Sequence, residues 1–211
     1  MKRIIKLVTI VAVSMLVSVS ANAQWRIGAN FGVQVPAGDF EKGSATVDLD
    51  AGTVFVFPGT KMGFGGNAIL EYRFTPHFGL NVNGGYYSMK MKNEFNLLGF
   101  NLIDFNQNVD FLNFNFGGRF YLFQKVQPYI GAEIGTYSIG LDGLNAVGLN
   151  NNTYFGLSPV LGLQVKLSNK FAIDLGLKYN YIFSKNDVKG PDFNYTTFSG
   201  TLGLVYTLGN W

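Results

Sequence analysis

The segment Tyr195–Leu208 alternates between apolar and polar side chains, and this pattern constrains the fold more than any other feature of the chain. The even positions from Phe198 to Leu208 carry Phe, Gly, Leu, Leu, Tyr and Leu, whereas the odd positions from Thr197 to Thr207 carry Thr, Ser, Thr, Gly, Val and Thr. Alternation with a period of two predicts a β-strand with two different faces. One apolar and one polar face are typical of a transmembrane barrel strand, which has lipid outside and a polar interior.

The N-terminus has the features of a secretory signal. Three basic residues (Lys2, Arg3 and Lys6) precede an apolar run at 7–19, and Ser-Ala-Asn-Ala follows, ending at Ala23. Small residues at these positions are read by a signal peptidase, so we predict a signal peptide at 1–23, cleaved after Ala23, and one mature domain at 24–211. The alternative is an uncleaved anchor, but the apolar run is shorter than the roughly 20 residues that a spanning helix needs.

Removal of the signal changes the charge balance. Three of the sixteen basic residues precede Ala23, so thirteen remain beside the thirteen acidic residues, and the mature chain is formally neutral. A neutral chain gives no support for nucleic-acid binding. The chain also contains no cysteine, which excludes disulfides and thiolate chemistry, and leaves no lipidation site after Ala23.

The same alternation recurs along the mature chain and predicts eight strands, separated in turn by long and short connections. The strands are Trp25–Val35, Met62–Phe74, Phe78–Met91, Asn108–Phe123, Tyr129–Ser138, Thr153–Leu167, Phe171–Ser184 and Tyr195–Leu208. The long connections are 36–61, 92–107, 139–152 and 185–194, and the short ones are 75–77, 124–128 and 168–170. Short turns on one side and long loops on the other are typical of outer-membrane barrels with both termini in the periplasm.

We therefore expect an all-β fold, an eight-stranded antiparallel transmembrane up-and-down β-barrel. The first strand must pair with the last, because each unpaired backbone group in hydrocarbon costs several kcal/mol. The alternative is a soluble eight-stranded calycin, whose cavity would be lined by apolar side chains. In this chain the charged residues share a face with Asn, Gln, Gly and Ser, which is the reverse of that arrangement and favours the membrane barrel.

Charged side chains on the inward face define a candidate site. They are Arg26, Glu71, Arg73, Arg119, Glu133, Lys166, Asp174 and Lys178. An eight-stranded barrel is just wide enough for its own side chains, so we expect these charges and the neighbouring amides to fill it as a paired, hydrogen-bonded polar network. The alternative is a gate in which Glu71, Arg119, Glu133 and Lys178 exchange partners, opening a narrow path that the surplus positive charge makes selective for anions.

Two of the long connections contain apolar residues that would lie beyond the membrane. The aromatic ones are Phe55, Phe57, Phe95, Phe100 and Phe105. Strand hairpins with an apolar edge are able to pair with a strand of an extracellular partner, so these residues form a possible surface-interaction site. The alternatives are that they pack on one another or extend the lipid-facing belt. A third possibility is that a small hydrophobic molecule enters through an aromatic-lined mouth.

The segment Thr201-Leu202-Gly203-Leu204-Val205-Tyr206-Thr207-Leu208 carries a family resemblance. With Thr201, Gly203, Tyr206 and Leu208 at its key positions, it resembles the β-signal of small OmpA/OmpX-like barrels and of the porin-like outer-membrane β-barrel family common in Bacteroidota. The resemblance implies recognition by the barrel-assembly machinery. It also implies a location in the outer membrane of a Gram-negative-type cell envelope, in contact with lipid and lipopolysaccharide. Trp211 departs from the pattern, because the terminal aromatic residue is out of phase with the apolar face.

The sequence offers little for catalysis. The one histidine, His77, lies in a predicted periplasmic turn, without a serine or metal-ligand cluster that would give it a role. The carboxylates Asp39, Glu41, Asp48 and Asp50 lack the spacing of an EF-hand, so a solvated loop is preferred over a divalent-cation site. We predict a non-enzymatic barrel without a cofactor, with a structural or surface-interaction (adhesion or partner-binding) role. The alternative is a narrow gated channel for small solutes.

Overall fold

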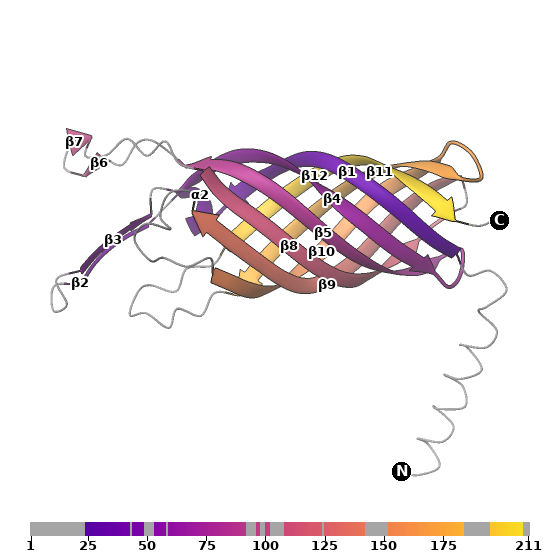
Figure 1. The fold of residues 1–211 in the computed structure, drawn as a ribbon, viewed down its shortest axis with the longest axis horizontal. Helices are drawn as coiled ribbons and strands as arrows, with labels where there is room; N and C mark the ends of the chain where they lie inside the picture. Colours follow the sequence, from indigo (N-terminus) through magenta and orange to yellow (C-terminus); the bar gives the residue numbers. More distant parts are fainter. Residues whose placement is uncertain are drawn as a thin grey trace, which may run out of the picture.

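Eight long strands close into a barrel in the computed structural model of the chain (Figure 1). The structure describes residues 24–42, 44–48, 53–57, 59–91, 96–97, 100–101, 108–123, 125–141, 152–183 and 195–208. The barrel strands are β1 (Gln24–Ala37), β4 (Thr60–Arg73), β5 (Phe78–Met91), β8 (Asn108–Tyr121), β9 (Val126–Leu141), β10 (Asn152–Lys166), β11 (Phe171–Phe183) and β12 (Tyr195–Leu208). The predicted eight-stranded antiparallel barrel is therefore confirmed, and the predicted strand bounds differ from these by at most three residues. The predicted signal peptide at 1–23 lies outside the described residues.

The first and last barrel strands pair with each other along their whole length. The β1–β12 register runs from Trp25↔Leu208 to Ala37↔Thr196, while the other edge of β1 pairs with β4. No open strand edge is left in the barrel wall, as insertion into hydrocarbon requires. None of the helices in the described part of the chain is long and apolar enough to cross a membrane.

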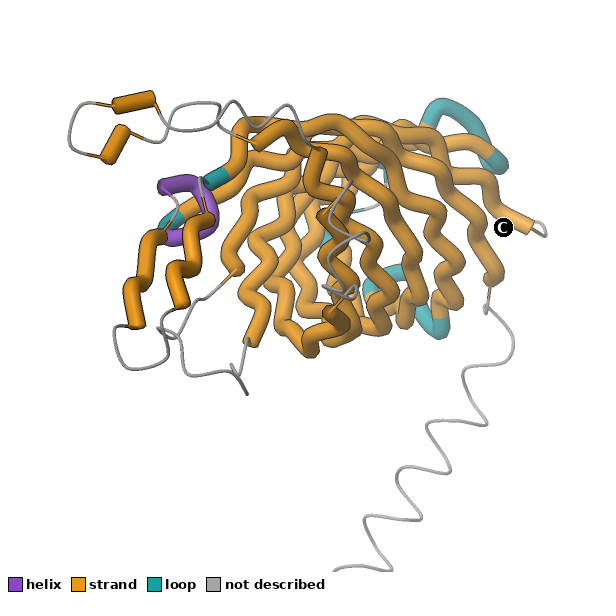
Figure 2. The backbone as a smooth tube through the Cα atoms, turned by 60° about the vertical axis from the view of Figure 1, so that its left-hand side comes forward, coloured by secondary structure: helices purple, strands orange, loops and turns teal. Residues whose placement is uncertain are grey.

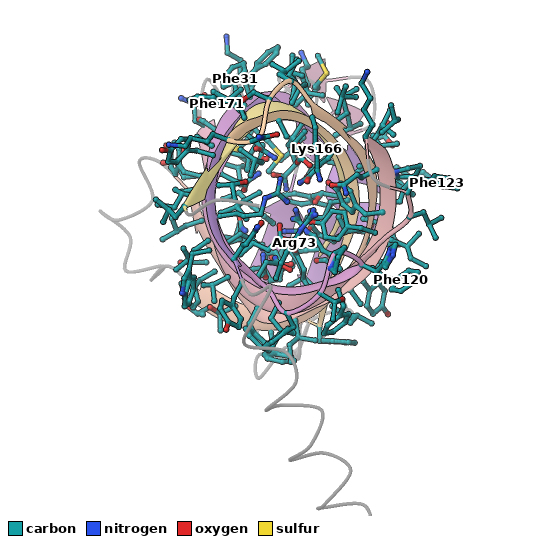
Figure 3. All side chains as sticks on the ribbon, turned by 90° about the vertical axis from the view of Figure 1, so that its right-hand side faces the viewer. Phe31, Arg73, Phe120, Phe123, Lys166 and Phe171 are labelled. Carbon is teal, nitrogen blue, oxygen red and sulfur yellow. The ribbon has the colours of Figure 1, made fainter. Side chains whose placement is uncertain are left out.

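The two faces of the wall have opposite polarity, as the alternation predicts. Phe31 and Leu202 point outward and are 66% and 57% exposed, whereas Arg26 on the inward face is 1% exposed. Viewed from the end that carries the termini, Phe31, Phe120, Phe123 and Phe171 lie around the outside of the barrel, and Arg73 and Lys166 lie within it (Figure 3). The outside is therefore suited to lipid, and the inside holds the charges.

The long connections contain secondary structure beyond the eight predicted strands. The connection predicted as a loop at 36–61 contains the one-turn helix α2 (Asp39–Lys42) and the hairpin β2 (Ser44–Asp48)–β3 (Thr53–Phe57). The connection at 92–107 contains the short pair β6 (Asn96–Leu97)–β7 (Phe100–Asn101). These elements lie at the end of the barrel opposite the termini (Figures 1 and 2). The strand hairpins considered for these two connections are therefore present, and α2 was not predicted.

The turn predicted at 124–128 is also shorter than expected. Val126, Gln127 and Pro128 belong to β9, and Pro128 is paired with Leu163 on β10. Proline is tolerated near the first residues of a strand, where the loss of one backbone donor is least costly. The proline therefore marks the beginning of this strand and not, as predicted, the end of a turn.

Inward-facing glycines make room for asparagine side chains on neighbouring strands. Gly85 is the cross-strand partner of Asn67 on one side and of Asn113 on the other. A Cβ atom at Gly85 would overlap the Oδ1 atom of Asn67. Gly203 stands in the same relation to Asn30, its partner on β1. The narrow interior thus accommodates its amides because the opposing positions have no side chain.

We expect Gly85→Ala to lower the free energy of unfolding by about 1–3 kcal/mol, the usual cost of overpacking a filled interior. Gly84→Ala is the matched control, because a Cβ atom at Gly84 would meet only ordinary contacts, the nearest being the Asn113 carbonyl oxygen at 3.8 Å. The measurement is urea unfolding of both variants in phospholipid vesicles, followed by Trp fluorescence. Equal stability of the two variants would contradict this account of the glycines.

Candidate functional site

The inward charges form two groups, and the first lies at the end of the barrel that carries the termini. Glu71 is the centre of this group. Its Oε1 atom is 2.7 Å from Arg73 Nε, and its Oε2 atom is 3.6 Å from Arg26 Nη1. Strand pairing explains the arrangement, because Arg26 is directly opposite Glu71, and Arg73 follows two residues later on the same face. The Gln164 Oε1 atom accepts hydrogen bonds from both arginines, at 2.8 and 2.9 Å.

The second group is centred on Glu133 and joins three further strands. Lys178 Nζ on β11 lies 2.8 Å from one carboxylate oxygen, and Arg119 Nη2 on β8 lies 3.1 Å from the other. The amide of Asn81 donates a further hydrogen bond of 2.8 Å to Glu133. Glu133 is 1% exposed, so its charge depends on these partners and not on solvent.

A column of aromatic and cationic side chains connects the two groups. The Arg73 guanidinium lies 3.5 Å from the centre of the Tyr121 ring, Tyr121 lies 5.2 Å from Tyr129, and Arg119 lies 5.0 Å from the Tyr129 ring. The Tyr121 hydroxyl donates to Glu71 at 2.8 Å, and the Tyr129 hydroxyl donates to Asp174 at 3.3 Å. Both tyrosines are buried, and the column therefore fills the middle of the lumen.

The sequence analysis did not select these two tyrosines, because it chose its inward candidates by charge. A signal for them was present. Tyr121 and Tyr129 have the same parity as Arg119 and Glu133 on their own strands, which places them on the inward face.

Asp174 and Lys166 complete the predicted set. Asp174 accepts a hydrogen bond of 3.0 Å from Asn30 Nδ2 in addition to the one from Tyr129. Lys166 lies at the end of β10 and is only partly buried, and its ammonium is repelled by Arg26 and Arg73. The structure thus brings seven of the eight predicted charges into one connected interior and leaves Lys166 at its mouth.

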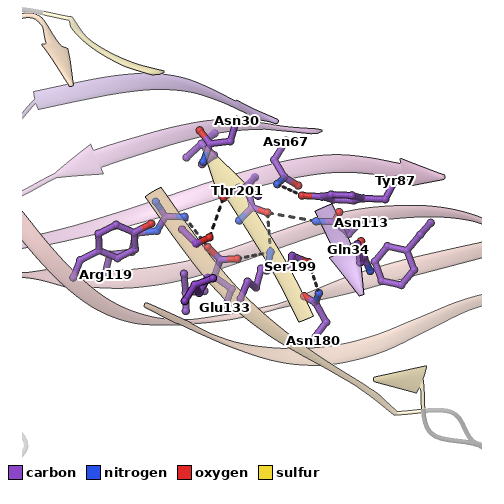
Figure 4. Close-up of a pocket in the computed structure, with 18 residues that line it drawn as sticks. Asn30, Gln34, Asn67, Tyr87, Asn113, Arg119, Glu133, Asn180, Ser199 and Thr201 are labelled. Atoms are coloured by element: carbon purple, nitrogen blue, oxygen red, sulfur yellow. Dashed lines mark hydrogen bonds and ion pairs between the residues drawn. The ribbon is translucent and has the colours of Figure 1, made fainter. Parts of the chain in front are cut away.

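A small cavity lies beside the Glu133 group (Figure 4). Its volume is about 30 Å³, which is room for about two water molecules. Its lining includes Asn83 and Gln34, whose Nδ2 and Oε1 atoms have no protein partner. Lys178, which also lines the cavity, is 14% exposed and is the most accessible charge of the two groups. The cavity thus has room for water beside two polar atoms that lack a protein partner.

The end of the lumen farthest from the termini contains a large apolar cluster, and this corrects the prediction of a polar interior throughout. Nine buried side chains form what we call the outer apolar cluster: Phe40, Tyr87, Met89, Met91, Val109, Phe111, Tyr137, Ile139 and Ile182. Eight of them occupy inward positions near the outer ends of barrel strands, and Phe40 belongs to α2. The sequence analysis chose inward residues mainly by their charge, and none of the eight wall positions in this cluster carries a charged residue. The cluster therefore packs like the core of a soluble protein.

The residues predicted for assembly lie on β12. Those predicted for surface interaction lie on β3 and β7 or outside the described residues. Tyr206 and Leu208 face outward, and the Tyr206 ring lies 5.1 Å from that of Phe171, whereas Thr201 and Gly203 face the lumen. Phe55 and Phe57 belong to β3 and Phe100 belongs to β7, while Phe95 and Phe105 lie outside the described residues.

The predicted catalytic and metal candidates remain separate from the lumen groups. His77 lies in the turn between β4 and β5, and its Nδ1 atom is 2.9 Å from the backbone oxygen of Tyr121. Asp39 and Glu41 belong to α2, Asp48 ends β2, and Asp50 is not among the described residues. Within the part of the chain that the structure describes, no group of three His, Cys, Asp or Glu residues is placed to hold a metal ion.

A closed barrel with a lipid-facing apolar exterior and a filled, charge-paired lumen defines the class of small integral barrels of the outer membrane. The chain belongs to the outer membrane protein beta-barrel domain family, whose model matches residues 9–206. No curated protein matches the chain significantly in sequence.

Solved structures share this fold at low sequence identity. Neisserial surface protein A is 17% identical, with a TM-score of 0.55, and the alignment covers 89% of this chain and 99% of that one. OprG from Pseudomonas aeruginosa is 15% identical, with a TM-score of 0.56, over 88% of this chain and 96% of that one. A major outer membrane protein from Thermus thermophilus is 14% identical, with a TM-score of 0.52, over 89% and 100% of the respective chains.

We expect Glu133→Gln to lower the free energy of unfolding by about 3–5 kcal/mol, because it leaves two buried cations without their carboxylate. The control is Asp110→Asn. It removes a carboxylate of the same barrel that accepts a hydrogen bond from the exposed Tyr86 hydroxyl, and it should change stability by less than about 0.5 kcal/mol. Urea unfolding of both variants in vesicles measures the difference. A Glu133→Gln barrel as stable as the parent would show that the charge group is dispensable.

Proposed function

We propose that this barrel does not conduct solutes and acts as a structural and surface-interaction protein of the outer membrane, without enzymatic activity. The observation that carries the proposal is the column Arg73–Tyr121–Tyr129–Arg119, which fills the lumen between two ion-pair groups. Opening the lumen would require these buried cations to leave their carboxylates, which is costly in a narrow interior of low dielectric constant.

The outer end of the molecule is the proposed site of interaction. The hairpins β2–β3 and β6–β7 extend beyond the barrel wall at this end (Figure 1). Hairpins beyond a barrel wall are suited to pair with a strand of an extracellular partner, and the aromatic residues in the sequences of β3 and β7 support this use. The lipid-facing wall is proposed to contact membrane lipid and lipopolysaccharide, and Thr201, Gly203, Tyr206 and Leu208 are proposed to be recognised by the barrel-assembly machinery.

A narrow gated channel is the second candidate, and one observation favours it. Lys178 and Arg119 share the single carboxylate of Glu133 beside the small cavity shown in Figure 4. A shared carboxylate can transfer from one cation to the other, and such an exchange of partners is how a narrow charged pore opens.

We expect the mature protein, residues 24–211, to be electrically silent in a planar lipid bilayer, because the aromatic column blocks the lumen. A heat-shifted gel band confirms beforehand that the barrel is closed. The double variant Tyr121→Ala with Tyr129→Ala removes both rings and should produce discrete current steps, which shows that insertion is detectable. Reproducible steps from the unaltered protein would contradict the proposal.

The charge pairs give a test that separates the two candidates. Glu71→Ala with Lys178→Ala removes one negative and one positive charge, so the net charge of the lumen is unchanged. A structural barrel should remain silent, because the aromatic column is retained. A gated channel should change its open probability in single-channel recordings, because an ion pair that sets the gate has been removed from each group.

A further inference from the structure

The outer apolar cluster contains one residue that does not belong to the barrel wall. Phe40 lies on α2 and is completely buried, and its ring makes an edge contact with Tyr195 at 5.1 Å between centroids. The wall side chains around it include Met89, Met91 and Ile182. A phenyl ring from a connecting segment thus packs among apolar side chains of the barrel wall, at the end of the lumen opposite the termini.

The segment that carries Phe40 is short and lies at the rim of the barrel. Helix α2 has only four residues, which is less than the length at which a helix is stable by itself. It follows Gly38, whose φ of 62° lies in the left-handed region, where the chain bends over the rim of the barrel. Thr60 on β4 donates a hydrogen bond to the Phe40 carbonyl at 2.9 Å, and Thr196 on β12 donates one to the carbonyl of Ala37, the last residue of β1, at 2.8 Å.

The floor beneath the outer apolar cluster is polar. The Tyr137 hydroxyl is hydrogen bonded to Ser158 and to Asn180, and Asn180 donates in turn to Thr197 at 2.9 Å. Below this floor lie the Glu133 group and the aromatic column. An apolar group that enters from outside would therefore contact apolar side chains only within the outer apolar cluster.

The chemistry of the lining specifies what fits. Aromatic rings bind by edge and offset contacts of the kind that Tyr195 makes with Phe40, and methionine side chains adapt their shape to different apolar partners. The buried ring of Phe40 is the evidence for an aromatic ligand, because the outer apolar cluster already accommodates this phenyl group from outside the barrel wall.

We propose that the outer apolar cluster is a binding site for a small molecule with an aromatic group, and that Phe40 is an internal substitute which this ligand displaces. The proposal deepens the surface-interaction role proposed above by naming a ligand class at the outer face, and it rests on that role. Displacement of Phe40 releases α2 and so alters the segment that leads into the β2–β3 hairpin. Ligand binding in the mouth thereby changes the surface that the hairpin presents.

The test uses a spin label on α2, which is specific because the chain contains no cysteine. Lys42→Cys places a nitroxide at the exposed end of α2, and Lys61→Cys places the same label on β4 as the matched control. Both proteins are reconstituted in lipid nanodiscs and titrated with 4-fluorobenzyl alcohol, with empty nanodiscs giving the background partition. We expect the label at residue 42 to become mobile in the electron paramagnetic resonance spectrum, and the label at residue 61 to remain unchanged.

A second measurement removes the internal substitute. In Phe40→Ala the site is no longer occupied by the protein itself, so ¹⁹F NMR should show 4-fluorobenzyl alcohol binding about tenfold more tightly than to the unaltered protein, if α2 is docked about nine-tenths of the time. Phe111→Ala removes a phenyl ring from the same cluster but leaves α2 in place, and the residue-42 label should then remain as restricted as in the parent before ligand is added. Heat-shifted gel bands verify that each variant is folded.

The proposal is overturned if the probe leaves the residue-42 label restricted up to its solubility limit, or if Phe40→Ala binds no more tightly than the unaltered protein. These outcomes leave the proposed non-conducting role intact, since that role is judged by bilayer conductance. Conversely, current steps from the unaltered protein would contradict the non-conducting role, whereas a label at residue 42 mobilised by the probe would still support the binding site.

Discussion

Pairing of every backbone amide within the membrane is the constraint on which the rest of this structure depends. Hydrocarbon offers no hydrogen-bond partner, so the sheet must close, and β1 is paired on both edges, with β12 and with β4. Closure with eight strands leaves an interior that side chains fill. Inward side chains are therefore largely desolvated, and an inward charge needs a partner of opposite charge inside the barrel.

The two ends of the lumen meet this requirement in different ways. Toward the termini, Glu71 and Glu133 each hold two cations, and the rings of Tyr121 and Tyr129 separate the two groups. Toward the outside, most buried side chains are apolar, and Phe40 from α2 is buried among them. Charge groups and aromatic rings therefore occupy the part of the lumen nearer the termini, and mostly apolar side chains occupy its outer end. Its functional surface is thus expected where the chain leaves the wall.

Much of the barrel wall could be predicted from the sequence, but fewer of the side chains that fill the lumen could. The alternation in Tyr195–Leu208 specified a strand and both of its faces, and the same parity placed Arg26 and Glu71 on the inward face. Tyr121 and Tyr129 were missed because residue type was weighed above parity. Phe40 was missed because nothing in a one-turn helix within a long connection signals burial. Pro128 was assigned to a turn, although a strand tolerates proline near its start.

The sequence by itself determined the class of protein, the number of strands and which side chains face lipid. These properties depend on a period of two residues, which is local and can be read along one strand. The tertiary structure alone decided that Glu133 on β9 joins Arg119 on β8 and Lys178 on β11, that two tyrosines meet inside the lumen, and that Phe40 is buried at its outer end. These contacts cross the barrel between strands, so they depend on register and closure, which no single strand contains.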